Sequence, residues 1–160
     1  MAGDSRFCTK KGGYSVLYAA EDFATAFVET VVRDSLVGRT RRRIRPVELT
    51  ARCATTFASV GRLALLDLRN DGCVTMGAPT DAVGARNHSA GRALGRSIHD
   101  DHPHVDGILY ASRLNGRDCY AIFDRAVHKL GDGSPPLSTL EHHPELPAVL
   151  RAYRIEIAVS

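Results

Sequence analysis

The stretch RFCTKKGGYSVLYAAEDFATAFVE, residues 6–29, predicts a basic loop, then a strand, then a helix. The strand is the apolar run Ser15–Ala20, and Asp22 is placed to cap a helix with apolar residues at helical spacing. Those residues are Phe23, Ala26, Phe27 and Val31. The stretch places a guanidinium (Arg6) before the strand, a phenol (Tyr18) on it and a carboxylate (Glu29) near the middle of the helix. Such groups together suit a ligand with phosphates and hydroxyls, such as a dinucleotide.

The composition indicates a cytoplasmic globular protein of one domain, spanning residues 1–160. The chain is 44% hydrophobic and 24% charged, with a net charge of +3, which is less basic than a dedicated nucleic-acid binder. The cysteines, at positions 8, 53, 73 and 119, are too widely spaced for a zinc ribbon or a redox pair, so we expect reduced thiols. We see no signal-peptide pattern and no apolar run near ~20 residues, so we expect neither secretion nor membrane insertion.

Further along the chain, the pattern predicts an α+β fold with mixed or antiparallel sheets and flanking helices. Helices are expected near 22–36 and 89–99, strands at Val47–Cys53, Leu63–Leu68 and Tyr153–Val159, a long irregular loop at Cys73–Arg86, and a linker at Gly131–Pro136. A hairpin is predicted from residues 107–113 and 118–123, with Asn115-Gly116 favouring a type I′ turn. Either Ser89 or Asn87 is placed to cap the second helix.

The densest charge run, Arg39–Arg45, is open to two interpretations. It is either a solvated connection or a patch for an acidic partner or a nucleic acid. Because no aromatic residue interrupts it, stacking on single-stranded nucleic acid is disfavoured.

Other chemical motifs are weak. The segment His99–Asp106 contains metal-ligand residue types, but Pro103 breaks the helix that would align its histidines, so we expect no metal site. The chain has no P-loop, no Rossmann glycine fingerprint and no Gly-x-Ser-x-Gly elbow of a serine hydrolase.

An ordered set of motifs resembles the RES domain, a family named for an Arg, a Glu and a Ser. The resemblance covers about residues 3–125, and its specificity lies in the order of the pieces. The pieces are Gly-x-Ser-Arg6-Phe7, Leu17-Tyr18-Ala19-Ala20, Thr25-Ala26-x-x-Glu29, a Leu-x-Asp-Leu-Arg strand, His88-Ser89-x-x-x-Ala-Leu-Gly, Asp106-Gly107-Ile108-x-Tyr110-x-Ser112-Arg113 and Cys-x-x-x-Phe123-Asp124.

The resemblance implies a fold like that of ADP-ribosyltransferases, NAD⁺ as the substrate and no metal. It implies a toxin whose partner is an Xre-like helix-turn-helix antitoxin that covers the active site. The toxin alone is expected to bind no nucleic acid directly. By position, Arg6, Tyr18 and Glu29 would be the active-site trio, and Ser89 and Ser112 are both candidates for the family serine, with Ser89 preferred for its place at a helix start. RES domains usually open with a further strand that carries another NAD-contacting Arg, whereas this chain opens at Met1-Ala2-Gly3-Asp4. Either the start is truncated and an earlier segment supplies this NAD-contacting Arg, or another basic residue of the chain contacts NAD⁺ in its place.

The implied chemistry is cleavage of the bond between nicotinamide and ribose. Glu29 would hold the ribose hydroxyls and stabilise the developing cation, and Arg6 would pair with the pyrophosphate. Tyr18 would contact the nicotinamide ribose, and Ser89 or Ser112 the amide or a hydroxyl. The acceptor of ADP-ribose stays open: water gives a glycohydrolase, phosphate a phosphorylase, and a protein side chain a mono-ADP-ribosyltransferase. The alternative from a different class of function is a non-catalytic module that binds an acidic partner or a nucleic acid through residues 39–45.

Overall fold

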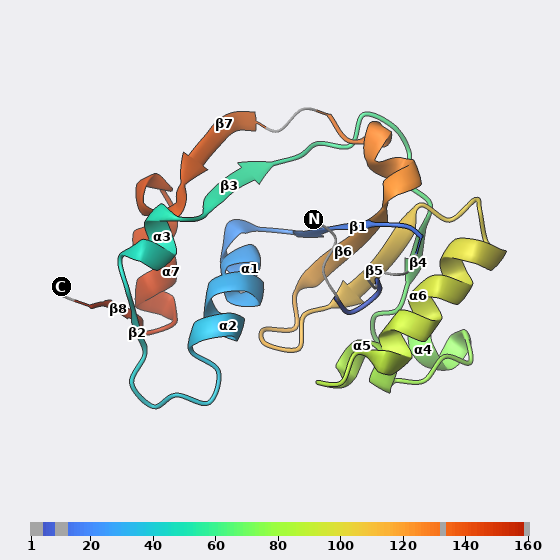
Figure 1. Cartoon of the computed structure of the whole chain (residues 1–160), viewed down its shortest axis with the longest axis horizontal. Coiled ribbons are helices and arrows are strands. Elements are labelled where there is room, and N and C mark those ends of the chain that lie inside the picture. Colours follow the sequence, from blue (N-terminus) through green and yellow to red (C-terminus); the bar gives the residue numbers. More distant parts are fainter. Residues whose placement is uncertain (1–4, 9–12, 132–133, 159–160) are drawn as a thin grey trace. The chain divides into compact units, whose positions relative to one another are not determined.

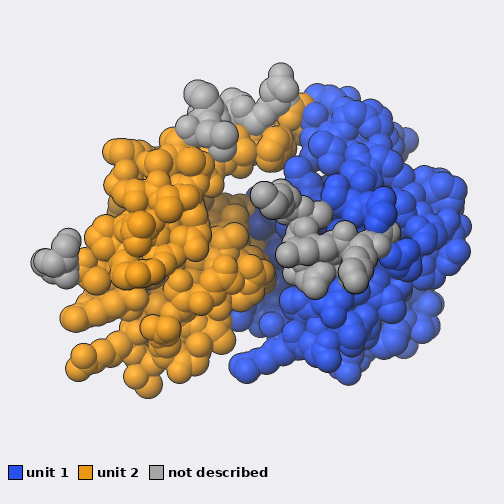
Figure 2. All heavy atoms as spheres, in the orientation of Figure 1, with its two compact units in different colours: residues 1–21, 59–130 blue, residues 22–58, 131–160 orange. Residues whose placement is uncertain are grey.

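The computed structural model describes residues 5–8, 13–131 and 134–158, and these form two compact units. Each unit combines two separate stretches of the chain, coloured in Figure 2: residues 1–21 with 59–130, and residues 22–58 with 131–160. The single domain that the sequence predicted over residues 1–160 stays a prediction.

The first unit is built on a four-stranded mixed sheet with strand order β1-β6-β5-β4 (Figure 1). Its strands are β1 (Val16–Ala20), β4 (Leu65–Asp67), β5 (Gly107–Ala111) and β6 (Asp118–Phe123). β6 pairs antiparallel with both β1 and β5, whereas β4 pairs parallel with β5. The predicted α+β class with a mixed sheet is confirmed.

The predicted hairpin is β5 and β6, but its predicted type I′ turn is wrong. That turn needs positive φ at Asn115 and Gly116, and only Gly116 has it, at 75°. The strands are joined instead by the loop 112–117, in which the N–H of Gly116 donates to the carbonyl of Ser112 at 2.9 Å. The Ser112 hydroxyl also accepts from the N–H of Leu114, which favours this longer loop over a two-residue turn.

Three helices accompany the sheet of the first unit. They are α4 (Gly72–Thr75), α5 (Asp81–Gly84) and α6 (Ser89–Asp101), and a 3₁₀ helix, η2 (Asp124–Lys129), follows β6. The predicted helix at 89–99 is confirmed as α6. The predicted irregular loop at Cys73–Arg86 is wrong, because it contains two short helical turns that its Gly and Pro content did not reveal.

The core of the first unit forms around Phe7 and Phe123, which are fully buried. Its other buried members are Cys8, Tyr14, Leu68, Cys73, Ile98, Ile108, Tyr110, Cys119 and Ala121. The sequence predicted a basic loop before β1, but its residues Phe7 and Cys8 are buried and belong to this core.

A buried carboxylate pairs with a partly exposed lysine where β5 begins. Asp106 is 6% exposed, accepts from the Lys129 ammonium at 2.7 and 2.8 Å, and accepts from the N–H of Ala64 at 2.8 Å. Burial raises the pKa of the Asp106 carboxyl, but the contacts with Lys129 and Ala64 outweigh it, so the pKa is lowered overall. The carboxylate is thus held charged inside the unit.

The second unit begins with the helix that the sequence predicted at 22–36. It consists of α1 (Phe23–Phe27), a π-helical turn η1 (Val28–Val32) and α2 (Arg33–Ser35). Asp22 caps it as predicted, since its carboxylate accepts from the N–H of Thr25 at 2.7 Å. The π-helical turn was not predicted, and such turns are frequent at functional sites.

The remaining elements of the second unit are short. They are β2 (Arg43–Ile44), α3 (Val47–Thr50), β3 (Cys53–Thr56), β7 (Ser134–Thr139), the 3₁₀ turn η3 (Leu140–His142), α7 (Leu146–Ala152) and β8 (Glu156–Ile157). β2 pairs parallel with β8, and β3 pairs antiparallel with β7. A separate core packs this unit, with Phe27, Val28, Val31, Val32, Leu36, Ile44, Leu49, Leu140, Leu146, Val149 and Ile155.

Three predicted elements of the second unit are corrected. The predicted strand Val47–Cys53 is wrong, because Pro46 has helical backbone angles and opens α3, which buries Leu49. The predicted linker 131–136 is wrong at 134–136, which belong to β7, and its residues 132–133 lie outside the described residues. The predicted last strand is confirmed only at 156–157, since Arg154 takes a positive φ of 52° ahead of it, and Val159 lies outside the described residues.

All four cysteines are free thiols, as predicted; three are buried and Cys53 is exposed. Within the described residues, no helix has the length and apolar character needed to cross a membrane.

Candidate functional site

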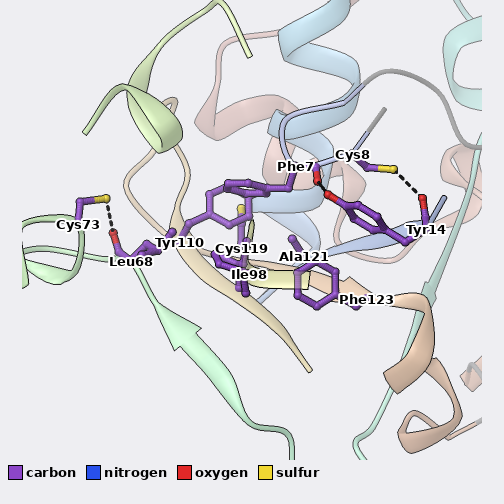
Figure 3. Packing of buried hydrophobic residues seen from close by; sticks show 11 residues of the cluster. Phe7, Cys8, Tyr14, Leu68, Cys73, Ile98, Tyr110, Cys119, Ala121 and Phe123 are labelled. Carbon is purple, nitrogen blue, oxygen red and sulfur yellow. Dashed lines mark hydrogen bonds between the residues drawn. The ribbon is translucent and has the colours of Figure 1, made fainter. Parts of the chain in front are cut away.

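The Arg6-Phe7 segment is held by two tyrosine hydroxyls that act on one residue. The N–H of Phe7 donates to the Tyr18 hydroxyl at 2.9 Å, and the Tyr14 hydroxyl donates to the Phe7 carbonyl at 2.6 Å. Figure 3 shows the second of these bonds beside the buried rings of Phe7, Tyr110 and Phe123. We call this arrangement, Tyr14 and Tyr18 on the backbone of Phe7, the tyrosine clamp. It gives Arg6 a backbone anchored at the next residue.

Helix α6 supports the same segment through two glycines. A Cβ placed at Gly95 would lie 2.4 Å from the Phe7 carbonyl oxygen, and one at Gly91 would lie 2.6 Å from that of Arg6. These contacts are too close for any side chain, so the segment lies directly on the helix backbone. This role was not predicted from the sequence, although the four-residue spacing of Gly91 and Gly95 inside a predicted helix indicates a close backbone approach.

The Arg6 guanidinium donates to carbonyls at the C-terminal end of α5. Its Nη1 lies 2.7 Å from the carbonyl oxygen of Val83 and 3.2 Å from that of Ala85. Through its backbone and Cγ, Arg6 also packs against Gly91, in the first turn of the 13-residue helix α6. A guanidinium and a helix N-terminus together favour an anion.

Both tyrosines of the clamp stay protonated at neutral pH. Burial raises the pKa of Tyr18, and the hydrogen bonds with Ser5 and Phe7 oppose it only in part. Burial, aided by Cys8, raises the pKa of Tyr14 from 10.0 to about 12. Tyr18 is nonetheless 39% exposed, and its hydroxyl shares a 2.8 Å hydrogen bond with Ser5. Its hydroxyl therefore positions the Arg6 segment, while the predicted contact with a nicotinamide ribose stays a prediction.

The two candidate serines have different environments. Ser89 is exposed at the first residue of α6, where its N–H donates to the Asn87 side chain at 2.9 Å. The N-cap position is occupied by His88, so the predicted cap at Ser89 or Asn87 is wrong. Ser112 is 3% exposed, and its hydroxyl accepts from Leu114 at 3.1 Å within the hairpin loop. Ser89 is thus the more accessible serine for a ligand.

Glu29 belongs to the second unit, whereas Arg6, Tyr18, Ser89 and Ser112 all belong to the first. It occupies the second position of the π-helical turn, with a side chain 21% exposed. Its carboxylate lies 3.8 Å from the Arg33 guanidinium one turn later. Glu29 is therefore a partly exposed carboxylate in an irregular helical turn.

Much of the basic run 39–45 has structural partners. Arg42 donates to the Tyr153 carbonyl at 2.9 Å, Arg43 pairs with Glu156 at 2.7 Å, and Arg45 pairs with Glu48 at 3.1 Å. These contacts fasten β2 to β8 and to α3. A nucleic-acid patch would thus have fewer available charges than the sequence suggested, and a binding role for the run stays a prediction.

The histidines of residues 99–106 pack against aromatic rings. His99 stacks on Tyr14, with ring centroids 4.2 Å apart and planes at 9°, and His102 meets His104 edge to face. His99 therefore supports the tyrosine clamp. Among the described residues, no group of three or more His, Cys, Asp and Glu side chains is arranged to hold a metal ion.

The chain is similar to known proteins. A probable toxin of Sinorhizobium fredii, y4kH, is 44% identical over 98 residues, which are 59% of this chain and 74% of that protein. The fold is similar to a chain in the crystal structure of the M. tuberculosis MbcT–MbcA toxin–antitoxin complex, with a TM-score of 0.62 and 19% identity over 90% of this chain and 76% of that one. The RES domain family model matches residues 1–148, and the chain therefore belongs to the RES domain family.

Proposed function

We propose that this protein is the toxin of a toxin–antitoxin pair and that it consumes NAD⁺ by cleaving the bond between nicotinamide and ribose. Membership of the RES family supports the proposal, as do the relative named a probable toxin and the structural neighbour from a toxin–antitoxin complex. The enzyme class that follows is NAD⁺ glycohydrolase or phosphorylase.

The observation that carries the proposal is the anchored Arg6 beside the start of α6. The planar fork of a guanidinium matches the oxygens of a diphosphate, and the positive end of a helix dipole adds to the attraction. Arg6 now donates to the neutral carbonyl oxygens of Val83 and Ala85. A phosphate would replace them with negatively charged acceptors, which form stronger bonds with a guanidinium. Ser89, exposed at the first residue of α6, would add a hydroxyl for the ligand.

The proposed reaction needs a carboxylate, and we assign that role to Glu29. The bond between the ribose C1′ and the nicotinamide nitrogen breaks, its electron pair goes to nicotinamide, which leaves neutral, and positive charge develops on the ribose. A carboxylate stabilises that charge and can hold the ribose hydroxyls. Water then adds to C1′ and loses a proton, which gives ADP-ribose; inorganic phosphate would instead give ADP-ribose 1″-phosphate. Mono-ADP-ribosylation of a cellular protein is the second candidate and differs only in the acceptor.

The partner we propose is an Xre-like helix-turn-helix antitoxin that covers the active site. A toxin that depletes NAD⁺ needs neutralisation in its own cell, and covering the substrate site is the direct way to achieve it. The structural neighbour comes from a complex of a toxin with an antitoxin, which supports a partner of this kind.

The test is nicotinamide release from NAD⁺ by the purified protein, with and without inorganic phosphate. We expect Glu29→Gln to lower kcat by about 10²-fold or more, as when a group that stabilises transition-state charge is removed. Asp34→Asn is the matched control, because Asp34 contacts the same arginine, Arg33, at 2.9 Å on the same helical stretch. We expect this control to retain activity.

The outcomes separate the candidate functions. Release that depends on Glu29 supports NAD⁺ cleavage, and a requirement for phosphate identifies a phosphorylase. Label transfer from NAD⁺ to a protein, without release in buffer alone, would identify an ADP-ribosyltransferase. Equal release by the Glu29→Gln variant and the wild type would overturn the assignment of the carboxylate. Salt-dependent binding to DNA with neither cleavage nor transfer would instead favour a binding module.

A further inference from the structure

The turn that carries Glu29 departs from the hydrogen-bond pattern of an α-helix. It is the π-helical turn η1, Val28–Val32, which lies between α1 and α2 (Figure 1). The N–H of Arg33 donates to the carbonyl of Val28, five residues back, and to that of Thr30. Its α-helical acceptor would be the carbonyl four residues back, that of Glu29. The turn thus accommodates one more residue than an α-helical turn, and one residue corresponds to about 100° of rotation about the helix axis.

The residues of this turn disfavour a regular α-helix. Four of the five are β-branched, namely Val28, Thr30, Val31 and Val32. Such side chains lose rotamer freedom against the preceding turn of an α-helix, so a wider turn relieves the crowding. The three valines are buried in the core of the second unit, which fixes the turn on that side.

The Thr30 hydroxyl acts on the carbonyls of the preceding turn. It donates to the carbonyl of Ala26 at 2.7 Å, with the carbonyl of Phe27 as a second, longer acceptor at 3.4 Å. The Ala26 carbonyl is also the α-helical acceptor for the N–H of Thr30, so the hydroxyl competes with the backbone for it. A side chain that enters the backbone ladder in this way distorts a helix. Because Thr30 is exposed, its methyl group adds little to the core, and the hydroxyl is its main contribution.

We propose that Thr30 is a positioning residue, whose hydroxyl holds the π-helical turn and thereby sets the direction of the Glu29 carboxylate. The inference rests on the proposed function, in which that carboxylate stabilises the ribose cation. A side chain leaves the helix along its Cα–Cβ bond, and the backbone angles of the turn determine the direction of that bond. A return to α-helical pairing would therefore reorient Glu29 relative to the buried valines on either side of it. Thr30 acts only through Glu29 and does not contact the substrate.

The direct test compares two substitutions of Thr30 in crystal structures. Thr30→Val keeps the shape of the side chain and removes the hydroxyl, whereas Thr30→Ser keeps the hydroxyl. In Thr30→Val we expect the N–H of Arg33 to donate to the carbonyl of Glu29 and the Glu29 carboxylate to move. In Thr30→Ser and the wild type, the N–H should donate to the carbonyl of Val28.

The second measurement is the steady-state kinetics of NAD⁺ cleavage. Thr30→Val should lower kcat about 10-fold or more with a smaller change in KM, because a misplacement of about 1 Å can cost about 10²-fold in rate. Thr30→Ser should stay within about twofold of the wild type. The matched control is Thr50→Val, since Thr50 is also exposed and its hydroxyl donates to the Val47 carbonyl at 3.4 Å within the α-helical turn α3. The control should keep the wild-type kcat and KM.

Failure of this inference can be told apart from failure of the proposed function. A Thr30→Val variant that keeps the π-helical turn and the direction of Glu29 overturns the inference, whatever its activity. A variant with an α-helical turn and a displaced Glu29 supports it if kcat falls. If the wild type cleaves no NAD⁺, the same displacement still supports the positioning of Glu29, and only the proposed function fails. Equal kcat in Thr30→Val and an active wild type would overturn the inference, as would equal losses of kcat and unfolding temperature in the valine and serine variants.

Discussion

The tyrosine clamp predicts that Tyr14→Phe destabilises the protein and weakens the site, although the Tyr14 hydroxyl faces the core. The substitution keeps the ring and its stack on His99 but removes the hydroxyl that donates to the Phe7 carbonyl at 2.6 Å. Phe7 is fully buried, so its carbonyl loses this partner in a place that water does not reach. Arg6, whose backbone precedes that peptide, should be held less firmly.

The expected size follows from one buried hydrogen bond. A buried acceptor left without its partner costs about 1–3 kcal/mol of unfolding free energy. For a chain of this length, 2 kcal/mol corresponds to a fall of roughly 4–8 °C in Tm. Because the hydroxyls of Tyr14 and Tyr18 act on the same residue, the two phenylalanine variants should be non-additive by about 0.5 kcal/mol or more.

The same residue gives the stability a dependence on alkaline pH. Burial raises the pKa of Tyr14 from 10.0 to about 12, so the folded protein retains the phenolic proton more strongly than the unfolded chain. The raised pKa therefore contributes about 3 kcal/mol to the free energy of unfolding. This contribution is fully present below pH 10 and is lost as the pH rises toward 12. Tyr14→Phe should remove it, so the variant should lose less stability than the wild type over that interval.

The assay is thermal unfolding followed by far-ultraviolet circular dichroism, at pH 7 and at steps between pH 10 and 12. Because the chain contains no tryptophan, fluorescence offers a weaker signal. A Tyr14→Phe variant that unfolds within about 1 °C of the wild type at pH 7, with the same alkaline profile, would refute the clamp. In parallel, KM for NAD⁺ should rise in the variant while kcat changes little, if Arg6 binds the diphosphate.

Three further predictions follow from single contacts. Gly95→Ala should lower stability and raise KM for NAD⁺, because its Cβ would lie 2.4 Å from the Phe7 carbonyl oxygen; an unchanged Tm would contradict the close packing. Asp106→Asn should cost about 1–3 kcal/mol, since it replaces the buried carboxylate that pairs with the partly exposed Lys129 ammonium. In the wild type the lowered pKa of Asp106 contributes stability that is present above the ordinary aspartate pKa and is lost on acidification, so denaturation at acid pH should be less steep in the asparagine variant. Ser112→Ala should cost about 1 kcal/mol in urea unfolding through loss of its loop hydrogen bond, and full stability of the variant would argue against that role.

Prediction from the sequence succeeded where the signal is local. Asp22 and the apolar spacing after it predicted the helix of residues 23–35, and the apolar runs on either side of Asn115 predicted the hairpin. It failed where neighbouring contacts outweigh local preference. Val47 and Thr50 favour strands, yet the proline before them and the burial of Leu49 give a helix.

The identities of the candidate site residues came from the sequence, because the ordered motifs place Arg6, Tyr18, Glu29 and the two serines in one family pattern. Their physical roles were decided by the tertiary structure. The bond from Arg6 to Val83 spans 77 positions. The same holds for the packing of Phe7 on Gly95. No local pattern encodes such pairs, since they exist only once strands and helices distant in the chain have packed together.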